Sequence, residues 1–247
     1  MRRQTRILMG MPITIALGEA PDHLRDEVFA YFAAVDQRFS LYRADSEISA
    51  LNQGRIALAQ ISPDMREVLD WADQTRRETR GYFDIRRADG SLDPSGIVKG
   101  WAVLNAAKFI EAAGVKHYFV DAGGDIQTGA KNGEGLDWTI GIRHPFQENA
   151  IVKALKLAGR GIATSGTYAR GHHIYNPHCR ERQIDEIVSL SVIAKDVLEA
   201  DRFATAAFAM GLEGIAFIED MPGLEGYVID AHGIATQSSG FGAFVVP

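Results

Sequence analysis

Apolar residues that recur every three or four positions predict the helices of this chain, because this spacing places them on one helical face. Asp22 is a candidate N-cap for the first helix, whose apolar stripe is Leu24, Val28, Phe32, Val35 and Phe39. Ser62 before Pro63 predicts the start of a second helix, since serine favours the N-cap and proline the first helical position. Further helices are expected over residues 99–113, 198–211 and 213–219.

Segments rich in β-branched and aromatic residues predict the strands. They span residues 7–17, 116–121, 138–143, 151–158, 186–194 and 226–230. Helices gather in the first half of the chain and strands in the second, which favours an α+β fold with mixed β-sheets flanked by helices. The length of 247 residues predicts one compact domain over residues 1–247, with at most two lobes.

Composition narrows the class of protein. The net charge of −6, without a stretch dense in lysine and arginine, argues against a nucleic-acid partner. A single cysteine, Cys179, excludes an internal disulfide. The start of the chain has neither a signal-peptide core nor a cleavage site, and no apolar run reaches the roughly 20 residues of a membrane span. We therefore expect a cytoplasmic protein without membrane insertion.

Two glycine-containing segments are candidates for ligand contact. Gly96 belongs to a loop that opens a helix, and Lys99 is expected in the first turn of that helix. A cation there opposes the helix dipole unless an anion such as a phosphate is near, although a solvated lysine is equally compatible. Gly123 and Gly124 follow a predicted strand, where they can form a tight turn or let a ligand approach the backbone.

Two further segments carry polar groups with metal or acid–base chemistry. His172, His173, His178 and Cys179 lie close together in the sequence; their irregular spacing favours a ligand-facing histidine over a zinc site or a plain loop. Asp201 and Thr205 share one face of an otherwise small and apolar helix. Either Asp201 caps this helix, which is the more common role, or both residues give oxygens to a hard cation such as magnesium.

In this order, the segments resemble the motifs of the FAD:protein FMN transferase family, the ApbE-like flavin transferases. The resemblance begins at Met9-Gly10 and covers nearly the whole chain. The motifs that carry it lie at residues 39–52, 81–84, 92–104, 122–129, 164–168 and 200–211. Asn176 departs from the family pattern, which has an aspartate after the catalytic histidine.

The resemblance implies a magnesium-dependent enzyme that splits FAD, transfers the FMN phosphoryl group to a threonine hydroxyl of an acceptor protein and releases AMP. A hydrolytic sibling that yields FMN and AMP, and a silent FAD-binding protein motivated by Asn176, are the alternatives. By the same resemblance, His173 and Lys99 are the catalytic candidates. The implied metal ligands are Asp201, Thr205 and backbone oxygens of Gly96 and Ala204. The implied FAD-binding residues are Met9, Ser40, Tyr42, Asp93, Lys99, Gly123, Gly124, Asp125, Thr164, Ser165, Gly166, Tyr168 and His173.

Overall fold

The computed structural model describes residues 1–21, 23–167 and 174–246. It begins with a hairpin of β1 (Arg2–Leu8) and β2 (Met11–Leu17), where we expected one strand over residues 7–17. The chain reverses at Met9 and Gly10, which both have positive φ. The strand β1 was missed because it lies at the edge of the sheet and its residues RRQTRIL lack a regular apolar alternation.

Three helices of the first half agree with the apolar pattern, whereas no helix was predicted over Glu47–Asn52. Their bounds are α1 (Leu24–Phe39), α2 (Glu47–Asn52), α3 (Pro63–Glu78) and α4 (Ser95–Ala112). The Ser62 side chain accepts a hydrogen bond from the Met65 amide, which confirms the predicted cap of α3. The N-cap position of α1 is His23, while Asp22 lies outside the described residues. Helix α4 begins at Ser95, before the expected start at Lys99.

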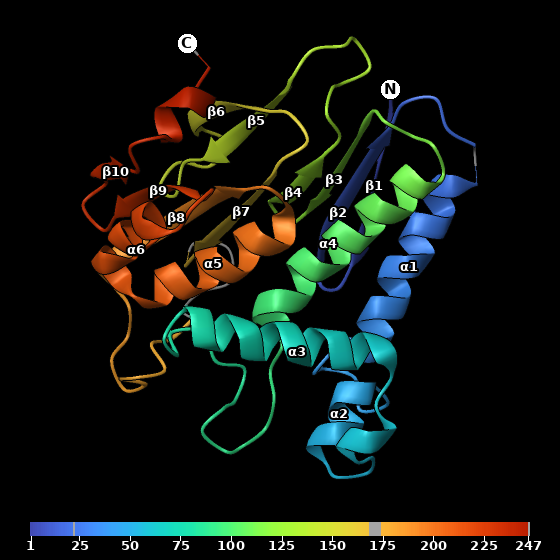
Figure 1. The fold of residues 1–247 in the computed structure, drawn as a ribbon, viewed down its shortest axis with the longest axis vertical. Helices are drawn as coiled ribbons and strands as arrows, with labels where there is room; N and C mark the ends of the chain where they lie inside the picture. The colour runs from blue at the N-terminus through green and yellow to red at the C-terminus, as the bar shows by residue number, and fades with distance from the viewer. Residues whose placement is uncertain (22, 168–173, 247) are drawn as a thin grey trace.

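An eight-stranded sheet forms the centre of the fold (Figure 1). Its order is β1-β2-β3-β4-β7-β8-β9-β10, and its further strands are β3 (Tyr118–Ala122), β4 (Asp125–Thr128), β7 (Gly161–Gly166), β8 (Ile187–Ala194), β9 (Glu225–Asp230) and β10 (Ala235–Gln237). The α+β class is confirmed. The prediction of mixed sheets is wrong, because every strand pair among the described residues is antiparallel. One reason is that tight turns such as those of β1–β2 and β3–β4 can join only antiparallel strands.

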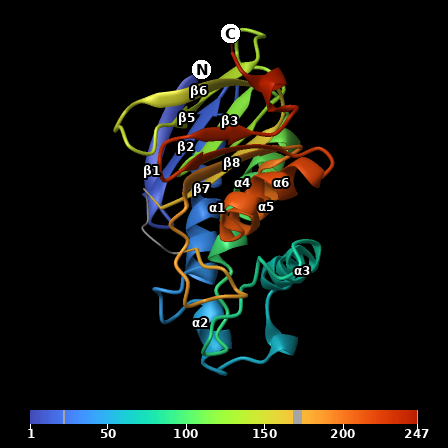
Figure 2. The same cartoon turned by 90° about the vertical axis from the view of Figure 1, so that its left-hand side faces the viewer.

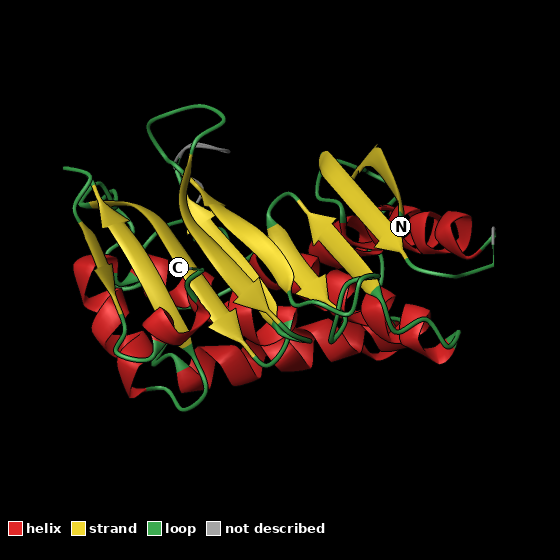
Figure 3. Ribbon diagram, turned by 90° about the horizontal axis from the view of Figure 1, so that it is seen from above, coloured by secondary structure: helices red, strands yellow, loops and turns green. Residues whose placement is uncertain are grey.

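Each face of this sheet is covered by a different layer (Figures 2 and 3). The helices lie on one face, where α5 (Val197–Ala209) and α6 (Gly214–Asp220) complete the layer. A two-stranded sheet of β5 (Trp138–Arg143) and β6 (Ile151–Leu157) packs on the other face through Ile140, Ile142, Leu155 and Leu157. Short 3₁₀ turns occur at Leu58–Gln60, Gly211–Glu213 and Phe241–Phe244.

The register of the sheet brings the polar segments together at one end of its strands. The end of β3 and the start of β4 adjoin the start of β2, because the Gly123 amide donates to the Pro12 carbonyl at 3.0 Å. The strand β7 finishes at the same end of the sheet, since the Thr164 amide donates to the Asp125 carboxylate. We missed β4 and β7 as strands because glycine and hydroxyl residues, rather than an apolar alternation, dominate their sequences or their flanks.

Within the described part of the chain, no helix has both the length and the apolarity needed to cross a bilayer.

Candidate active site

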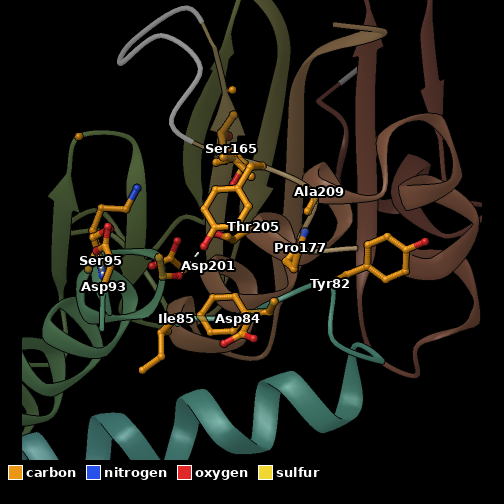
Figure 4. A pocket seen from close by; sticks show the side chains of 18 residues that line it. Tyr82, Asp84, Ile85, Asp93, Ser95, Ser165, Pro177, Asp201, Thr205 and Ala209 are labelled. Carbon is orange, nitrogen blue, oxygen red and sulfur yellow. Dashed lines mark hydrogen bonds between the residues drawn. The ribbon is translucent and has the colours of Figure 1, made fainter. Parts of the chain in front are cut away.

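A cleft opens at the end of the sheet where the β3–β4 turn lies, between the start of α4, the end of β7 and the middle of α5 (Figure 4). It contains about 1030 Å³ of empty space, counting its open mouth. In Figure 4, Asp201 and Thr205 lie in its middle, with Asp93 and Ser95 to one side. The predicted site residues that line it are Asp93, Gly96, Lys99, Gly123, Thr164, Ser165, Gly166, Asp201 and Thr205. Tertiary structure therefore gathers most of the predicted site in one place.

A buried ion pair anchors Lys99 at the wall of the cleft. Its Nζ lies 2.6 Å from Oδ2 of Asp125, whose side chain is only 1% exposed. Because α4 begins at Ser95, Lys99 lies in the second turn, so our dipole argument for a first-turn lysine was wrong. The Thr164 amide donates to the other oxygen of Asp125 at 3.2 Å. Asp125 thus lies behind the cleft wall and holds the lysine in place.

Asp201 is held inside the cleft by the backbone of α4. Its Oδ2 accepts a hydrogen bond of 2.7 Å from the Gly100 amide. A Cβ at position 100 would lie 2.7 Å from Cβ of Asp201 and 2.9 Å from the Val197 carbonyl, so this close approach requires glycine. The N-cap of α5 is Asp196, which accepts from the Glu199 amide at 2.9 Å. The capping role that we favoured for Asp201 is therefore wrong.

The electrostatic surroundings of Asp201 disfavour its ionised form. Burial, and then the charge of Asp125, raise the pKa of the Asp201 carboxyl well above its usual value, while the Lys99 ammonium and the Gly100 amide act in the opposite direction. One lysine faces two carboxyl groups here. A further positive charge in the cleft would stabilise both carboxylates.

Other oxygen donors converge beside Asp201. Thr205 lies one turn further along α5, and its hydroxyl lies 3.4 Å from the Gly96 carbonyl oxygen. A carboxylate, a hydroxyl and a backbone carbonyl from two packed helices suit a small hard cation. Ala204 is buried next to Thr205 on α5. Among the described residues, no group of three or more His, Cys, Asp and Glu side chains has the geometry to hold a metal ion, so a cation here would depend on hydroxyl and carbonyl oxygens.

The β3–β4 turn supports both interpretations of its glycines. Gly123 has a φ of 62° and lines the cleft, while the Gly124 amide donates to the Asp121 carboxylate at 2.8 Å. A Cβ at position 123 would lie 3.2 Å from the Met11 sulfur. The turn is therefore tight, and it also presents bare backbone to the cleft.

Several predicted residues lie elsewhere. Met9 forms the neighbouring β1–β2 turn but does not line the cleft. Ser40 and Tyr42 belong to the loop between α1 and α2, away from the cleft lining, and Tyr42 is fully exposed. Tyr168 and His173 lie outside the described residues.

The histidine-rich segment is described only in part, because His172 also lies outside the described residues. The ring of His178 packs edge-on against Tyr82, with centroids 4.6 Å apart, and its Nε2 lies 3.0 Å from the Arg80 carbonyl oxygen. Cys179 is exposed. His178 therefore supports the loop after α3, and these contacts add nothing in favour of the zinc alternative.

The cleft also contains residues that we did not assign to the site. The chain from Tyr82 to Ile85 forms its floor, and Phe83 packs on Gly96. Tyr175 and Pro177 also line the cleft, and the Tyr175 hydroxyl donates to the Arg86 carbonyl at 3.5 Å, next to this segment. The motif at residues 81–84 was already visible in the sequence, so its place in the family pattern was the signal that could have identified these residues.

Comparison with known proteins confirms the resemblance drawn from the motifs. The family model described as the ApbE family matches residues 9–89 and 86–228. A protein of Escherichia coli K12 named FAD:protein FMN transferase is 32% identical over 161 residues, which are 62% of this chain and 46% of that protein. The chain thus spans about half the length of this relative. A Klebsiella pneumoniae protein of the same name is 24% identical over 264 residues, covering 84% of this chain and 82% of that protein.

Solved structures share the fold. The flavin transferase ApbE from Vibrio cholerae superposes with a TM-score of 0.84 at 24% identity, covering 98% of both chains. The ApbE protein from Thermotoga maritima gives a TM-score of 0.88 at 18% identity, covering 100% of this chain and 99% of that one. At these identities, the likeness concerns the fold alone.

Proposed function

This chain belongs to the ApbE family, and from that membership we propose that it cleaves FAD and transfers the FMN phosphoryl group to a threonine of an acceptor protein, releasing AMP. The names of its relatives support the transferase reaction. The observation that carries the proposal is the convergence of Asp201, Thr205, Gly96 and Lys99, which come from two separate sequence motifs, in one open cleft. Pyrophosphate cleavage needs charge neutralisation and positioning of this kind more than covalent help from the protein.

We assign the magnesium site to Asp201, Thr205 and the backbone oxygens of Gly96 and Ala204. The raised pKa of the Asp201 carboxyl supports this assignment. A divalent cation would supply the positive charge that Asp125 and Asp201 need when both are ionised, since Lys99 balances only one of them. Magnesium, when bound, would neutralise phosphate oxygens as the bond between the phosphates breaks. The closeness of Thr205 to Gly96 means that the two helices need little rearrangement to offer their oxygens together.

Lys99 is proposed to bind the pyrophosphate. Its ammonium group reaches the cleft from α4, and the ion pair with Asp125 restricts its position. A fixed cation beside the scissile bond stabilises the charge that develops on the leaving AMP.

His173 is proposed as the acid–base residue, either accepting the proton of the attacking hydroxyl or protonating the leaving AMP. Its described neighbours Ile174 and Tyr175 both line the cleft, so the chain passes the cleft wall directly after His173.

The test is AMP release from FAD by the purified protein, with magnesium and then with EDTA, combined with the intact mass of any acceptor. Magnesium-dependent AMP together with a flavinylated acceptor supports the proposal. AMP with FMN free in solution indicates the hydrolytic alternative, and tight FAD binding without AMP release indicates a binding protein. Absence of FAD binding would exclude all three.

A matched pair of variants separates the metal site from the helix that carries it. Asp201→Ala should abolish the magnesium-dependent reaction. Asp196→Ala removes a carboxylate from the N-cap of the same helix and should cost about 1 kcal/mol of stability while the reaction remains. Equal activity losses in both variants would mean that the effect of Asp201 is structural only.

A further inference from the structure

A second groove lies on the opposite face of the sheet from the helices. Its floor is the face of β1–β3 that carries Arg3, Ala16, Phe119 and Asp121, and one wall is the strand β5. The groove encloses about 1120 Å³ of empty space, counting its open side. None of the functions proposed above uses this groove.

The wall of the groove is a free strand edge. The Val246 amide donates to the Ala154 carbonyl at 2.8 Å, so the polar backbone groups of Ala154 point away from β5. In an antiparallel pair, these directions alternate along the strand, and residues directly opposite share the same type of pairing. Gly141, opposite Ala154, and Thr139, two residues earlier, therefore direct their N–H and C=O groups away from β6. Among the described residues, no backbone group bonds to this edge of β5.

The groove leads to the active-site cleft. At one end of β5, the Trp138 ring stacks on Phe119 with centroids 5.6 Å apart. At the other end, Arg143 acts electrostatically on Asp121, next to the β3–β4 turn. Gly123 and Thr164 line both the groove and the cleft. A segment lying along β5 would thus leave the groove at the rim of the cleft.

The groove carries an excess of positive charge. Arg3 and Arg143 are both exposed, and both act on the single carboxyl group of Asp121. Within the described lining of the groove, Asp121 is the one carboxyl group beside these two guanidinium groups. An acidic segment is therefore a better electrostatic match than a basic one.

We propose that the groove docks the acceptor protein: an extended, acidic acceptor segment adds as a strand to the free edge of β5, above β1–β3, and delivers its hydroxyl past Gly123 into the cleft. This inference rests on the proposed function, since it presupposes a protein acceptor. Main-chain hydrogen bonds to Thr139 and Gly141 hold the segment, and the two arginines select its charge. Because main-chain atoms make these bonds, the same docking accepts acceptor segments with different side chains around the threonine.

Thr139→Pro tests this docking. Proline removes the outward N–H and blocks the edge, yet it breaks no bond between β5 and β6 because that N–H points away from β6. Thr139→Val is the matched control, since it keeps the N–H and suits a strand. The probe is a pool of twelve-residue peptides with one threonine each, incubated with FAD and magnesium, and mass spectrometry counts the peptides that gain FMN.

We expect Thr139→Pro to label the pool at least tenfold less than the wild type, with unchanged FAD affinity, while Thr139→Val labels normally. Arg143→Glu should shift labelling from acidic to basic peptides. If Thr139→Pro labels the peptides as well as the wild type, the docking site is wrong while the transfer reaction stands. If Thr139→Pro instead loses affinity for FAD, the groove holds the flavin nucleotide, and the docking site is again wrong. If light scattering shows that the wild type is a dimer and the Thr139→Pro variant a monomer, the groove binds a second copy of this chain, and the acceptor docking site is wrong. AMP release by a wild type that labels no peptide would refute the transfer reaction itself, and the docking site with it.

Discussion

Gly100→Ala perturbs the contact that places Asp201 in the cleft. The new Cβ would lie 2.7 Å from Cβ of Asp201 and 2.9 Å from the Val197 carbonyl oxygen, whereas ordinary contact begins at 3.4 Å. The two helices must therefore separate locally by 3.4 − 2.7 = 0.7 Å and 3.4 − 2.9 = 0.5 Å. Overpacking of this kind costs about 1–3 kcal/mol, and the better helix propensity of alanine returns about 1 kcal/mol. Since about 1 kcal/mol lowers Tm by about 2–4 °C in a chain of this size, the loss should not exceed about 8 °C.

The expected effect on the metal site is larger than the effect on stability. A separation of this size stretches the 2.7 Å bond between the Gly100 amide and Asp201 to or beyond the limit of hydrogen-bond geometry. A hydrogen bond to a charged group contributes about 1.5–3 kcal/mol, which corresponds to about tenfold to hundredfold weaker magnesium binding. The assay is AMP release from FAD as a function of magnesium concentration, beside a thermal melt in EDTA.

Gly226→Ala is the matched control. A Cβ there would lie 2.8 Å from the Ile215 side chain, which is a similar clash between β9 and α6, outside the cleft lining. It should lower Tm and leave the magnesium midpoint unchanged. If Gly100→Ala lowers Tm but its magnesium midpoint stays within twofold of the wild type, then the Gly100 amide does not hold a metal ligand, and the reasoning is refuted.

Three further predictions concern Asp201, His173 and Ser62. In EDTA, Asp201→Asn should gain stability relative to the wild type as pH rises above 3.8, because the unfolded wild-type chain then releases a proton that the folded state, with its raised Asp201 pKa, retains. A stability difference that is independent of pH in parallel melts would contradict the effect of burial on Asp201. His173→Ala should bind FAD but release AMP about 10²–10⁴-fold more slowly, and a twofold loss would remove His173 from the reaction. Ser62→Ala should cost about 1 kcal/mol through loss of the hydrogen bond from the Met65 amide, measured by denaturant unfolding, and an unchanged midpoint would show that this cap does not stabilise α3.

Local pattern alone was sufficient for most strands and for the helices other than α2. The stripe from Leu24 to Phe39 predicted α1, and Ser62 with Pro63 marked the start of α3, because the relevant contacts lie within one or two turns. The order of the polar motifs was enough to identify the family, and with it part of the cleft wall. The hairpin of β1 and β2 was missed because its turn depends on two positive φ angles that the apolar pattern does not encode.

The roles of individual site residues depended on contacts between distant parts of the chain. From the sequence, Asp201 was more plausible as a helix cap, and Lys99 as a first-turn cation. Lys99 lies in the second turn because α4 already begins at Ser95. Asp196 caps α5, and the Asp201 carboxylate instead accepts from the amide of Gly100, 101 residues earlier, where glycine lets α4 approach α5 closely. Lys99, one residue earlier, then pairs with Asp125 from β4. Secondary structure follows from neighbours along the chain, whereas burial and charge pairing follow from which helices pack together, and only the tertiary structure decides that.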